Sequence, residues 1–262
     1  MVESAPLSHW REARVAERRQ WTNELFTLKI DAPEIAFSAG QFASIALPTL
    51  PEDRATETMT ARPYSFLNAP NTAPHEFLIT TVAEGKLTPR LAQLNAGDPI
   101  WIGPSYGFFG CNDLPSARNL WMLATGTGIA PFLSILRTEQ PWQKFERIIF
   151  VHGVRYQQEL VYRDVIDGIK KQYKDRFLHL SSVTREKVAD DGALVCFERI
   201  TTALENGRLE KQVGEIISAE NSQVMLCGNP AMIDEVQSLL KVRDMRRHRL
   251  RKPGQITVES YW

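Results

Sequence analysis

The sequence predicts a protein of two domains, an antiparallel β domain over residues 1–113 and an α/β domain with a parallel sheet over residues 114–262. Three observations lead to this prediction. The chain has 262 residues, enough for one large or two modest domains. From about residue 10 to residue 110, short apolar runs are separated by turn residues. After residue 114, strand-like runs alternate with helix-like segments.

The first half contains β-branched and aromatic runs bounded by Gly, Pro, Asn or Asp, which is typical of an antiparallel barrel or sandwich. It offers one short helix candidate, LTPRLAQLN (87–95), which is closed by Ala96 and Gly97. The predicted strands lie at 21–30, 41–48, 76–83 and 99–103.

The second half begins at a boundary segment, Asp113-Leu114-Pro115-Ser116. Its alternation of strands and helices predicts a parallel sheet that is covered on both faces. The predicted strands are 119–125, 147–153, 177–184 and 223–228, and the predicted helices are 131–139, 160–173, 196–207 and 231–245.

Composition excludes several classes of protein. With 43 % hydrophobic and 24 % charged residues the chain is an ordinary globular protein, and 31 basic against 31 acidic residues predict no polyanionic partner such as nucleic acid. Cys111, Cys196 and Cys227 are too scattered for an iron–sulfur cluster or a cysteine-rich zinc site, so we expect no metal. The polar N-terminus and the absence of a long uninterrupted apolar stretch favour a cytosolic protein with no membrane span.

A glycine turn, Gly126-Thr127-Gly128-Ile129-Ala130-Pro131, joins the first strand of the second half to its helix. Glycines let the backbone approach a ligand, and a helix start offers free N–H groups to a phosphate. Pro131 stands where the dinucleotide fingerprint has its third glycine, so a tight turn without a ligand is the alternative interpretation.

Arginines follow the next two strands, at Arg155 and in Thr184-Arg185, and Arg199 lies in the helix after them. An acid at the end of the second strand binds a ribose 2′-hydroxyl, whereas an arginine accommodates a 2′-phosphate. Each arginine alone is an ordinary surface residue, but two at equivalent strand ends favour NADP(H) over NAD(H).

Five motifs in order resemble the plant-type ferredoxin–NADP⁺ reductase superfamily, and in particular its bacterial ferredoxin/flavodoxin reductases that end in an aromatic pair. The resemblance covers nearly the whole chain. The motifs are Arg62-Pro63-Tyr64-Ser65, Gly85-Lys86-Leu87-Thr88, the glycine turn, Cys227-Gly228-Asn229-Pro230 and Val258-Glu259-Ser260-Tyr261-Trp262.

The resemblance implies an antiparallel FAD-binding barrel followed by an NADP-binding domain. It implies that Tyr64 stacks on the flavin ring, that Arg62 binds the pyrophosphate and that Ser65 lies near flavin N5. The C-terminal pair would contact FAD, and which of the two covers the flavin stays open. The implied FAD-binding residues are Arg62, Pro63, Tyr64, Ser65, Leu78, Thr81, Lys86, Leu87, Thr88, Thr127, Tyr261 and Trp262.

For NADP(H), the resemblance adds Asn229 to the residues already identified, and it places Cys227 beside the site of hydride transfer. Glu259 matches a carboxylate implied in proton supply or nicotinamide positioning, and a solvated glutamate is the alternative. Glu198 stands where the family often has glycine, which weakens the assignment of Arg199. The expected NADP residues are Gly126, Thr127, Gly128, Arg155, Thr184, Arg185, Arg199 and Asn229, and the expected catalytic residues are Ser65, Cys227 and Glu259.

Seven cations crowd the twelve residues from Lys241 to Lys252, against the single acid Asp244. A solvated helix end is the simpler interpretation. The functional one is a docking surface for an acidic electron carrier, ferredoxin or flavodoxin, which complementary charge would steer. Nothing in the sequence requires more than a monomer.

We therefore expect an FAD-dependent oxidoreductase that moves electrons between NADP(H) and ferredoxin or flavodoxin, by hydride transfer at flavin N5 and one-electron steps to the carrier. The rivals are an NADH-dependent oxygenase reductase, a flavin-binding redox sensor, and a plain nucleotide-binding protein. The first usually carries an iron–sulfur domain and an acid where Arg155 stands.

Overall fold

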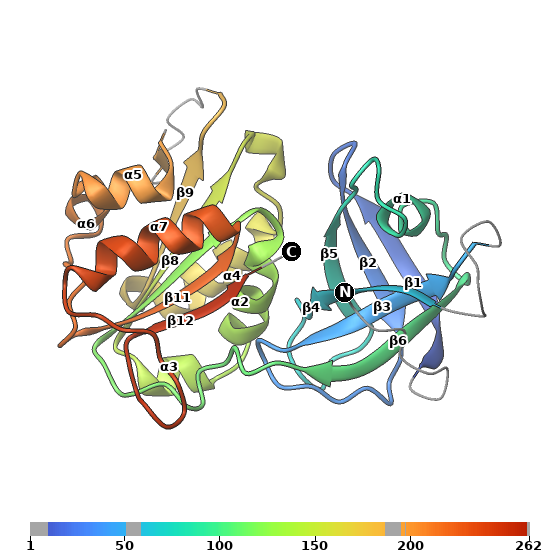
Figure 1. Ribbon diagram of the computed structural model, residues 1–262, viewed down its shortest axis with the longest axis horizontal. Coiled ribbons are helices and arrows are strands. Elements are labelled where there is room, and N and C mark those ends of the chain that lie inside the picture. The colour runs from blue at the N-terminus through green and yellow to red at the C-terminus, as the bar shows by residue number, and fades with distance from the viewer. Residues whose placement is uncertain (1–9, 51–58, 187–194, 197, 261–262) are drawn as a thin grey trace. The chain divides into compact units, whose positions relative to one another are not determined.

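The computed structural model describes residues 10–50, 59–186, 195–196 and 198–260, with 195–196 described by their backbone only. Contacts between residues divide the chain into two compact units, unit 1 up to Phe108 and unit 2 from Phe109. Each unit has a six-stranded sheet and a hydrophobic core of its own (Figure 1).

The sheet of unit 1 is antiparallel throughout, with the strand order β4-β3-β6-β1-β2-β5. Its elements are β1 (Arg11–Gln20), β2 (Leu25–Asp31), β3 (Phe42–Pro48), β4 (Met59–Ser65), β5 (His75–Thr80), α1 (Thr88–Leu91) and β6 (Pro99–Tyr106).

The two outer strands of this sheet meet where β4 ends. Leu67, two residues beyond β4, donates its N–H to the carbonyl of Glu76 on β5 over 2.9 Å. Phe26, Ile45 and Phe77 from three of the strands are fully buried in one cluster. The sheet therefore curls around a single core, and the predicted antiparallel barrel is confirmed.

Unit 1 differs from the sequence prediction in three places. Strand β1 was not predicted, because only Ala13 and Val15 of its ten residues are buried and the others, apart from Ala16, are polar. Strand β4, whose end is formed by Arg62–Ser65, is also absent from the predicted strands. The helix predicted over 87–95 ends at Leu91, because the next N–H groups, such as that of Leu94, bond three residues back and tighten the chain into a turn.

The sheet of unit 2 is parallel, with the order β10-β9-β8-β7-β11-β12. Helices α5, α6 and α7 cover one face, and α2, α3 and α4 cover the other (Figure 1). The elements are β7 (Asn119–Thr125), η3 (Gly126–Gly128), α2 (Ile129–Leu136), α3 (Gln140–Lys144), β8 (Arg147–Val154), η4 (Gln157–Glu159), α4 (Arg163–Tyr173), η5 (Lys174–Arg176), β9 (Phe177–Val183), β10 (Val195–Cys196), α5 (Ile200–Glu205), α6 (Arg208–Val213), β11 (Ser222–Gly228), α7 (Pro230–Lys241) and β12 (Ile256–Ser260).

The chain reverses its direction across the sheet between β7 and β11. From β7 it runs through β8 and β9 to β10, and then returns to β11 on the other side of β7. In open parallel sheets, ligands bind outside the carboxyl ends of the strands at this switch point. The glycine turn and Cys227-Gly228 both lie there, so the fold brings two of the sequence motifs together.

The α/β prediction for the second half is confirmed, with local corrections. The helix predicted over 196–207 begins only at Ile200, since Val195–Cys196 form the edge strand β10. The helix predicted over 160–173 begins at Arg163, because Tyr162 takes a left-handed conformation with φ 59°. Short α3, α6 and β12 were not predicted. Among the described helices, none combines the length and the hydropathy that crossing a bilayer requires.

Candidate functional site

The end of β4 carries the first group of predicted residues. Alternation along the strand puts Arg62 and Tyr64 on one face, and Pro63 and Ser65 on the other. Arg62 is exposed and its Nη1 donates to the carbonyl of Ala61 over 2.7 Å. Tyr64 packs against the barrel core, and burial raises the pKa of its phenol while the Arg62 charge opposes the rise. The face therefore presents a neutral aromatic ring beside a cation.

The turn after β5 carries the second group. Val82 donates its N–H to Thr88 Oγ1 over 2.8 Å, and Gly85 donates its N–H to Val82 O over 2.8 Å. A Cβ on Gly85 would lie 2.9 Å from the same Val82 oxygen, so the turn requires glycine. Thr88, one of the residues that the resemblance implies for FAD, therefore uses its hydroxyl as an acceptor inside the turn. Exposed Lys86 and buried Leu87 precede helix α1.

Thr81 lies between β5 and this turn. Its Oγ1 is buried and has no hydrogen-bond partner among the residues that the structure describes. A buried hydroxyl without a partner is rare, because it loses its hydrogen bonds to water without replacement. Leu78, three residues earlier on β5, is 4 % exposed. At this end of β5, the Thr81 hydroxyl could therefore form a hydrogen bond with an oxygen or an N–H group of a ligand.

In unit 2, the glycine turn interlocks with the end of β11. A Cβ on Gly128 would lie 2.5 Å from the Cys227 carbonyl oxygen. A Cβ on Gly228 would lie 2.3 Å from Thr125 Oγ1, and Gly228 has φ +126°. Thr125 Oγ1 in turn accepts the N–H of Asn229 over 2.8 Å. Both glycines are therefore required by close backbone approach.

His152 on β8 supports this turn, and the sequence analysis missed it. The carbonyl of Gly126 accepts a hydrogen bond from His152 Nε2 over 2.9 Å, which places the ring proton on Nε2. Burial lowers the pKa of His152 to about 4, so the ring is neutral near pH 7. The signal was a lone polar residue inside the apolar run RIIFVHG. His179 on β9 is also buried, and its pKa falls to about 3.

Two of the predicted catalytic residues are register partners. Cys227 on β11 pairs with Glu259 on β12, at the carboxyl edge of the sheet, and Cys227 is fully buried. Asn229 begins α7 as its N-cap, with Oδ1 accepting the N–H of Ala231 over 2.8 Å. Tyr261 and Trp262 lie outside the described residues.

The two strand-end arginines are neighbours. Arg185 donates its backbone N–H to the carbonyl of Arg155 over 2.9 Å, and Thr184 donates its N–H to Val154 O over 3.1 Å. Both arginine side chains are exposed. The fold thus places the backbones of the two arginines side by side beyond β8 and β9, and an arginine side chain can pair with the oxygens of a phosphate.

Arg199 lies directly before α5 and is exposed. The carboxylate of Glu198, which departs from the family pattern, faces other partners: Arg208 Nη1 at 3.5 Å and the Asn206 amide at 3.0 Å. Its charge is therefore partly neutralised beside Arg199.

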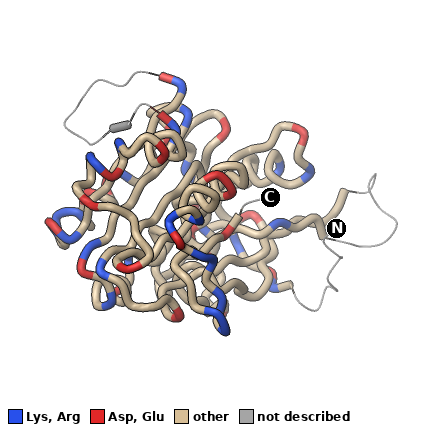
Figure 2. Tube along the Cα trace, turned by 60° about the vertical axis from the view of Figure 1, so that its left-hand side comes forward, with Lys and Arg blue, Asp and Glu red and all other residues tan. Residues whose placement is uncertain are grey.

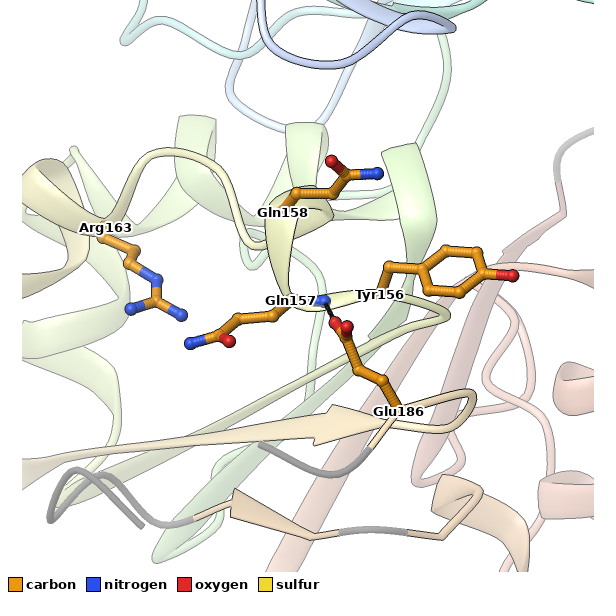
Figure 3. A pocket seen from close by; sticks show the side chains of 5 residues that line it. All are labelled: Tyr156, Gln157, Gln158, Arg163 and Glu186. Carbon is orange, nitrogen blue, oxygen red and sulfur yellow. Dashed lines mark hydrogen bonds between the residues drawn. The ribbon is translucent and has the colours of Figure 1, made fainter. Parts of the chain in front are cut away.

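A shallow pocket of about 500 Å³ opens beside the arginine-bearing strand ends. Figure 3 shows Gln157 and Arg163 pointing toward each other across it, while the Tyr156 ring turns to the opposite side. The N–H of Gln157 donates to the Glu186 carboxylate. The pocket is polar and open, so it suits a solvated polar ligand rather than an apolar one.

The cations of residues 241–252, here called the basic segment, have different surroundings. Arg243 forms an ion pair with Glu210 at 2.6 Å, and Arg246 Nε donates to Pro253 O over 3.0 Å. Arg247, Arg249, Arg251 and Lys252 are exposed. They belong to the loop between α7 and β12, which is drawn at the bottom of Figure 1 and is rich in Lys and Arg in Figure 2. Lys241 and Arg246 are exposed as well, so every cation of the predicted cluster except Arg243 faces solvent.

A β-barrel followed by a parallel-sheet unit with a glycine turn at its switch point is the architecture of a nucleotide-binding protein. The oxidoreductase NAD-binding domain family matches residues 122–238. A flavodoxin/ferredoxin–NADP reductase of Escherichia coli (strain K12) is 38 % identical over 258 residues, 98 % of this chain and 100 % of the relative. The reductase of the same name from Buchnera aphidicola subsp. Baizongia pistaciae is 37 % identical with the same coverage.

Among solved structures, the ferredoxin NADP⁺ reductase of Neisseria gonorrhoeae with bound FAD and NADP has a TM-score of 0.87 and 28 % identity. The match covers 97 % of this chain and 99 % of that one. This chain therefore belongs to the flavodoxin/ferredoxin–NADP reductase family, and the resemblance found in its motifs is confirmed.

Proposed function

We propose that the protein is an FAD-dependent oxidoreductase that exchanges electrons between NADP(H) and ferredoxin or flavodoxin. The observation that carries the proposal is the convergence at one sheet edge of the interlocked glycine turn and of Arg155 beside Arg185. The names of its full-length relatives support the same activity.

The barrel unit fits FAD. The buried Thr81 hydroxyl, which has no partner within the described part of the chain, can bond a polar ligand atom. The neutral ring of Tyr64 offers a flat apolar surface for an isoalloxazine. Arg62 supplies a cation for the pyrophosphate, and Leu87 and Thr88 supply N–H groups at the first turn of α1. The remaining residues proposed to hold FAD are Pro63, Ser65, Leu78, Lys86, Thr127, Tyr261 and Trp262.

In unit 2, the glycine turn would bring its backbone close to the pyrophosphate of NADP(H), and Arg155 and Arg185 would pair with the 2′-phosphate. Thr184, Arg199 and Asn229 complete the proposed site. The relative of known structure that carries both FAD and NADP supports this pair of ligands.

Bound FAD accepts two electrons from the nicotinamide as a hydride and passes them on singly. The chain's own residues position the reactants. Ser65 is proposed to donate a hydrogen bond near flavin N5, while buried Cys227 shapes the nicotinamide pocket. Glu259, its register partner, is proposed to orient the nicotinamide or hold a proton.

For the partner, we propose that the exposed cations of the basic segment dock ferredoxin or flavodoxin, which long-range charge would steer. Arg243 is excluded from this role by its ion pair with Glu210. The monomeric state and the cytosolic location stay predictions.

An anaerobic titration tests the function. Flavin absorbance of the purified protein is followed while NADPH, and in a second sample NADH, is added. Rapid bleaching by NADPH with a much weaker response to NADH supports both the FAD site and the arginine assignment. Equal responses favour the oxygenase-reductase alternative. Absence of NADPH-dependent reduction of every acceptor tried favours the redox sensor, and failure to bind added FAD refutes the proposal.

A further inference from the structure

Two carboxylates hold the loop that follows β8. Glu159 Oε2 accepts the backbone N–H of Arg155 over 2.8 Å and that of Tyr156 over 3.3 Å. The Glu186 carboxylate accepts the next N–H, that of Gln157 (Figure 3). Three consecutive backbone N–H groups therefore donate hydrogen bonds to carboxylates.

The negative charges of Glu159 and Glu186, taken alone, disfavour the binding of a phosphate at this loop. Glu159 bonds the backbone of Arg155, and Glu186 directly follows Arg185. Each therefore brings a negative charge to the region proposed for the negative 2′-phosphate, and like charges repel. The hydrogen bonds that the two acids form with the loop backbone favour the binding of NADPH. A carboxylate holds a backbone N–H more firmly than a neutral acceptor does, so the loop loses freedom in the unliganded protein.

The two acids also join the arginine loops. Glu186 directly follows Arg185, and its bond to Gln157 adds a second link to the one between Arg185 N and the Arg155 carbonyl. Glu159 fixes the backbone of Arg155 within its own loop. The two arginine side chains extend from backbones that these links hold, so the links fix the points from which the guanidinium groups reach out.

We propose that Glu159 and Glu186 are positioning residues that set the preference for NADPH over NADH by holding the Arg155 and Arg185 loops at the separation that the 2′-phosphate requires. The inference rests on the proposed function. NADH has no 2′-phosphate, so kcat/KM for NADH does not depend on the positions of the two arginines. Loss of either carboxylate therefore affects NADPH selectively.

The test compares kcat/KM for NADPH and for NADH, with ferricyanide as acceptor, in FAD-loaded wild type, Glu159→Ala, Glu159→Gln and Glu186→Ala. Glu159→Ala and Glu186→Ala are expected to lower the NADPH/NADH ratio about tenfold through a higher KM for NADPH, with kcat unchanged. Glu159→Gln keeps an oxygen acceptor for these N–H groups, although a weaker one, and removes a negative charge near the phosphate, so its ratio is expected to lie well above that of Glu159→Ala. Glu235→Ala, an exposed acid on α7, is the matched control.

The outcomes separate the possibilities. A ratio that is unchanged or raised in both alanine variants means that the acids act through charge alone, and overturns the inference. A parallel loss with both nucleotides, or a fall in Glu159→Gln as large as in Glu159→Ala, also overturns it. If wild type itself is not reduced by NADPH, the proposed function fails instead, whatever the variants do.

Discussion

Replacing Gly128 by alanine tests the interlock between the glycine turn and β11. The added Cβ would lie 2.5 Å from the Cys227 carbonyl oxygen and 2.7 Å from its carbonyl carbon, whereas real Cβ contacts are essentially never under 3.0 Å. The end of β11 must therefore move by roughly half an ångström. Gly128 has φ −60°, so alanine brings no dihedral strain and the effect comes from the contact alone.

The magnitude follows from what the movement breaks. Overpacking against backbone costs about 1–3 kcal/mol. Displacing β11 also strains the 2.8 Å bond from Asn229 N to Thr125 Oγ1, which is worth about 1 kcal/mol. We expect the free energy of unfolding to fall by about 3 kcal/mol, a drop in Tm of roughly 6–12 °C.

Gly126→Ala is the control, because its Cβ would meet nothing within 4 Å and only its φ of +55° is unfavourable. That conformation costs about 1 kcal/mol. Thermal unfolding of the full chain, followed by circular dichroism, compares the two variants. The reasoning is refuted if Gly128→Ala unfolds within 2 °C of wild type, or is more stable than Gly126→Ala.

Three further predictions rest on named side chains. Arg155→Ala is expected to raise KM for NADPH about ten- to a hundredfold, because a charged hydrogen bond to the 2′-phosphate is lost. KM for NADH should stay nearly unchanged. If steady-state assays show equal changes for both nucleotides, Arg155 does not bind the 2′-phosphate. Burial holds the pKa of His152 at about 4, below its ordinary 6.5, so its contribution to stability is complete above pH 6.5 and is lost as pH falls toward 4. Urea unfolding of His152→Gln at pH 7 and pH 4.5 should show a shallower loss than wild type, and parallel losses would contradict this. Arg251→Glu should slow reduction of flavodoxin at low salt and approach wild type at high salt, with ferricyanide reduction unaffected; the same slowing at every ionic strength would exclude electrostatic docking.

Burial on both faces decided which strands could be predicted. The runs 119–125 and 223–228 became β7 and β11, because strands inside a parallel sheet read as continuous apolar stretches. Strand β1 could not be predicted, because most of its residues are charged and only two of its side chains enter the core. Edge strand β10 has two residues, too few for any periodic pattern.

Some features of the candidate site could be predicted from one stretch of sequence, whereas others depend on contacts between distant parts of the chain. The arginines after β8 and β9 were predictable, since strand ends are visible in the sequence and adjacent parallel strands share an edge. The contact of Gly128 with Cys227 and the bond from His152 to Gly126 were not, because each depends on which strands become neighbours. The bond between Glu186 and Gln157 depends likewise on the pairing of β8 with β9.

The strand order of unit 2 has a consequence for synthesis. Strand β7 pairs with β8 soon after both have been made, but its other partner, β11, follows about one hundred residues later in the chain. Until then the open edge of β7 exposes an almost wholly apolar strand, a site at which nascent chains associate. Release of a complete chain from the ribosome therefore closes the sheet, and a message truncated before residue 222 would yield a product prone to aggregation.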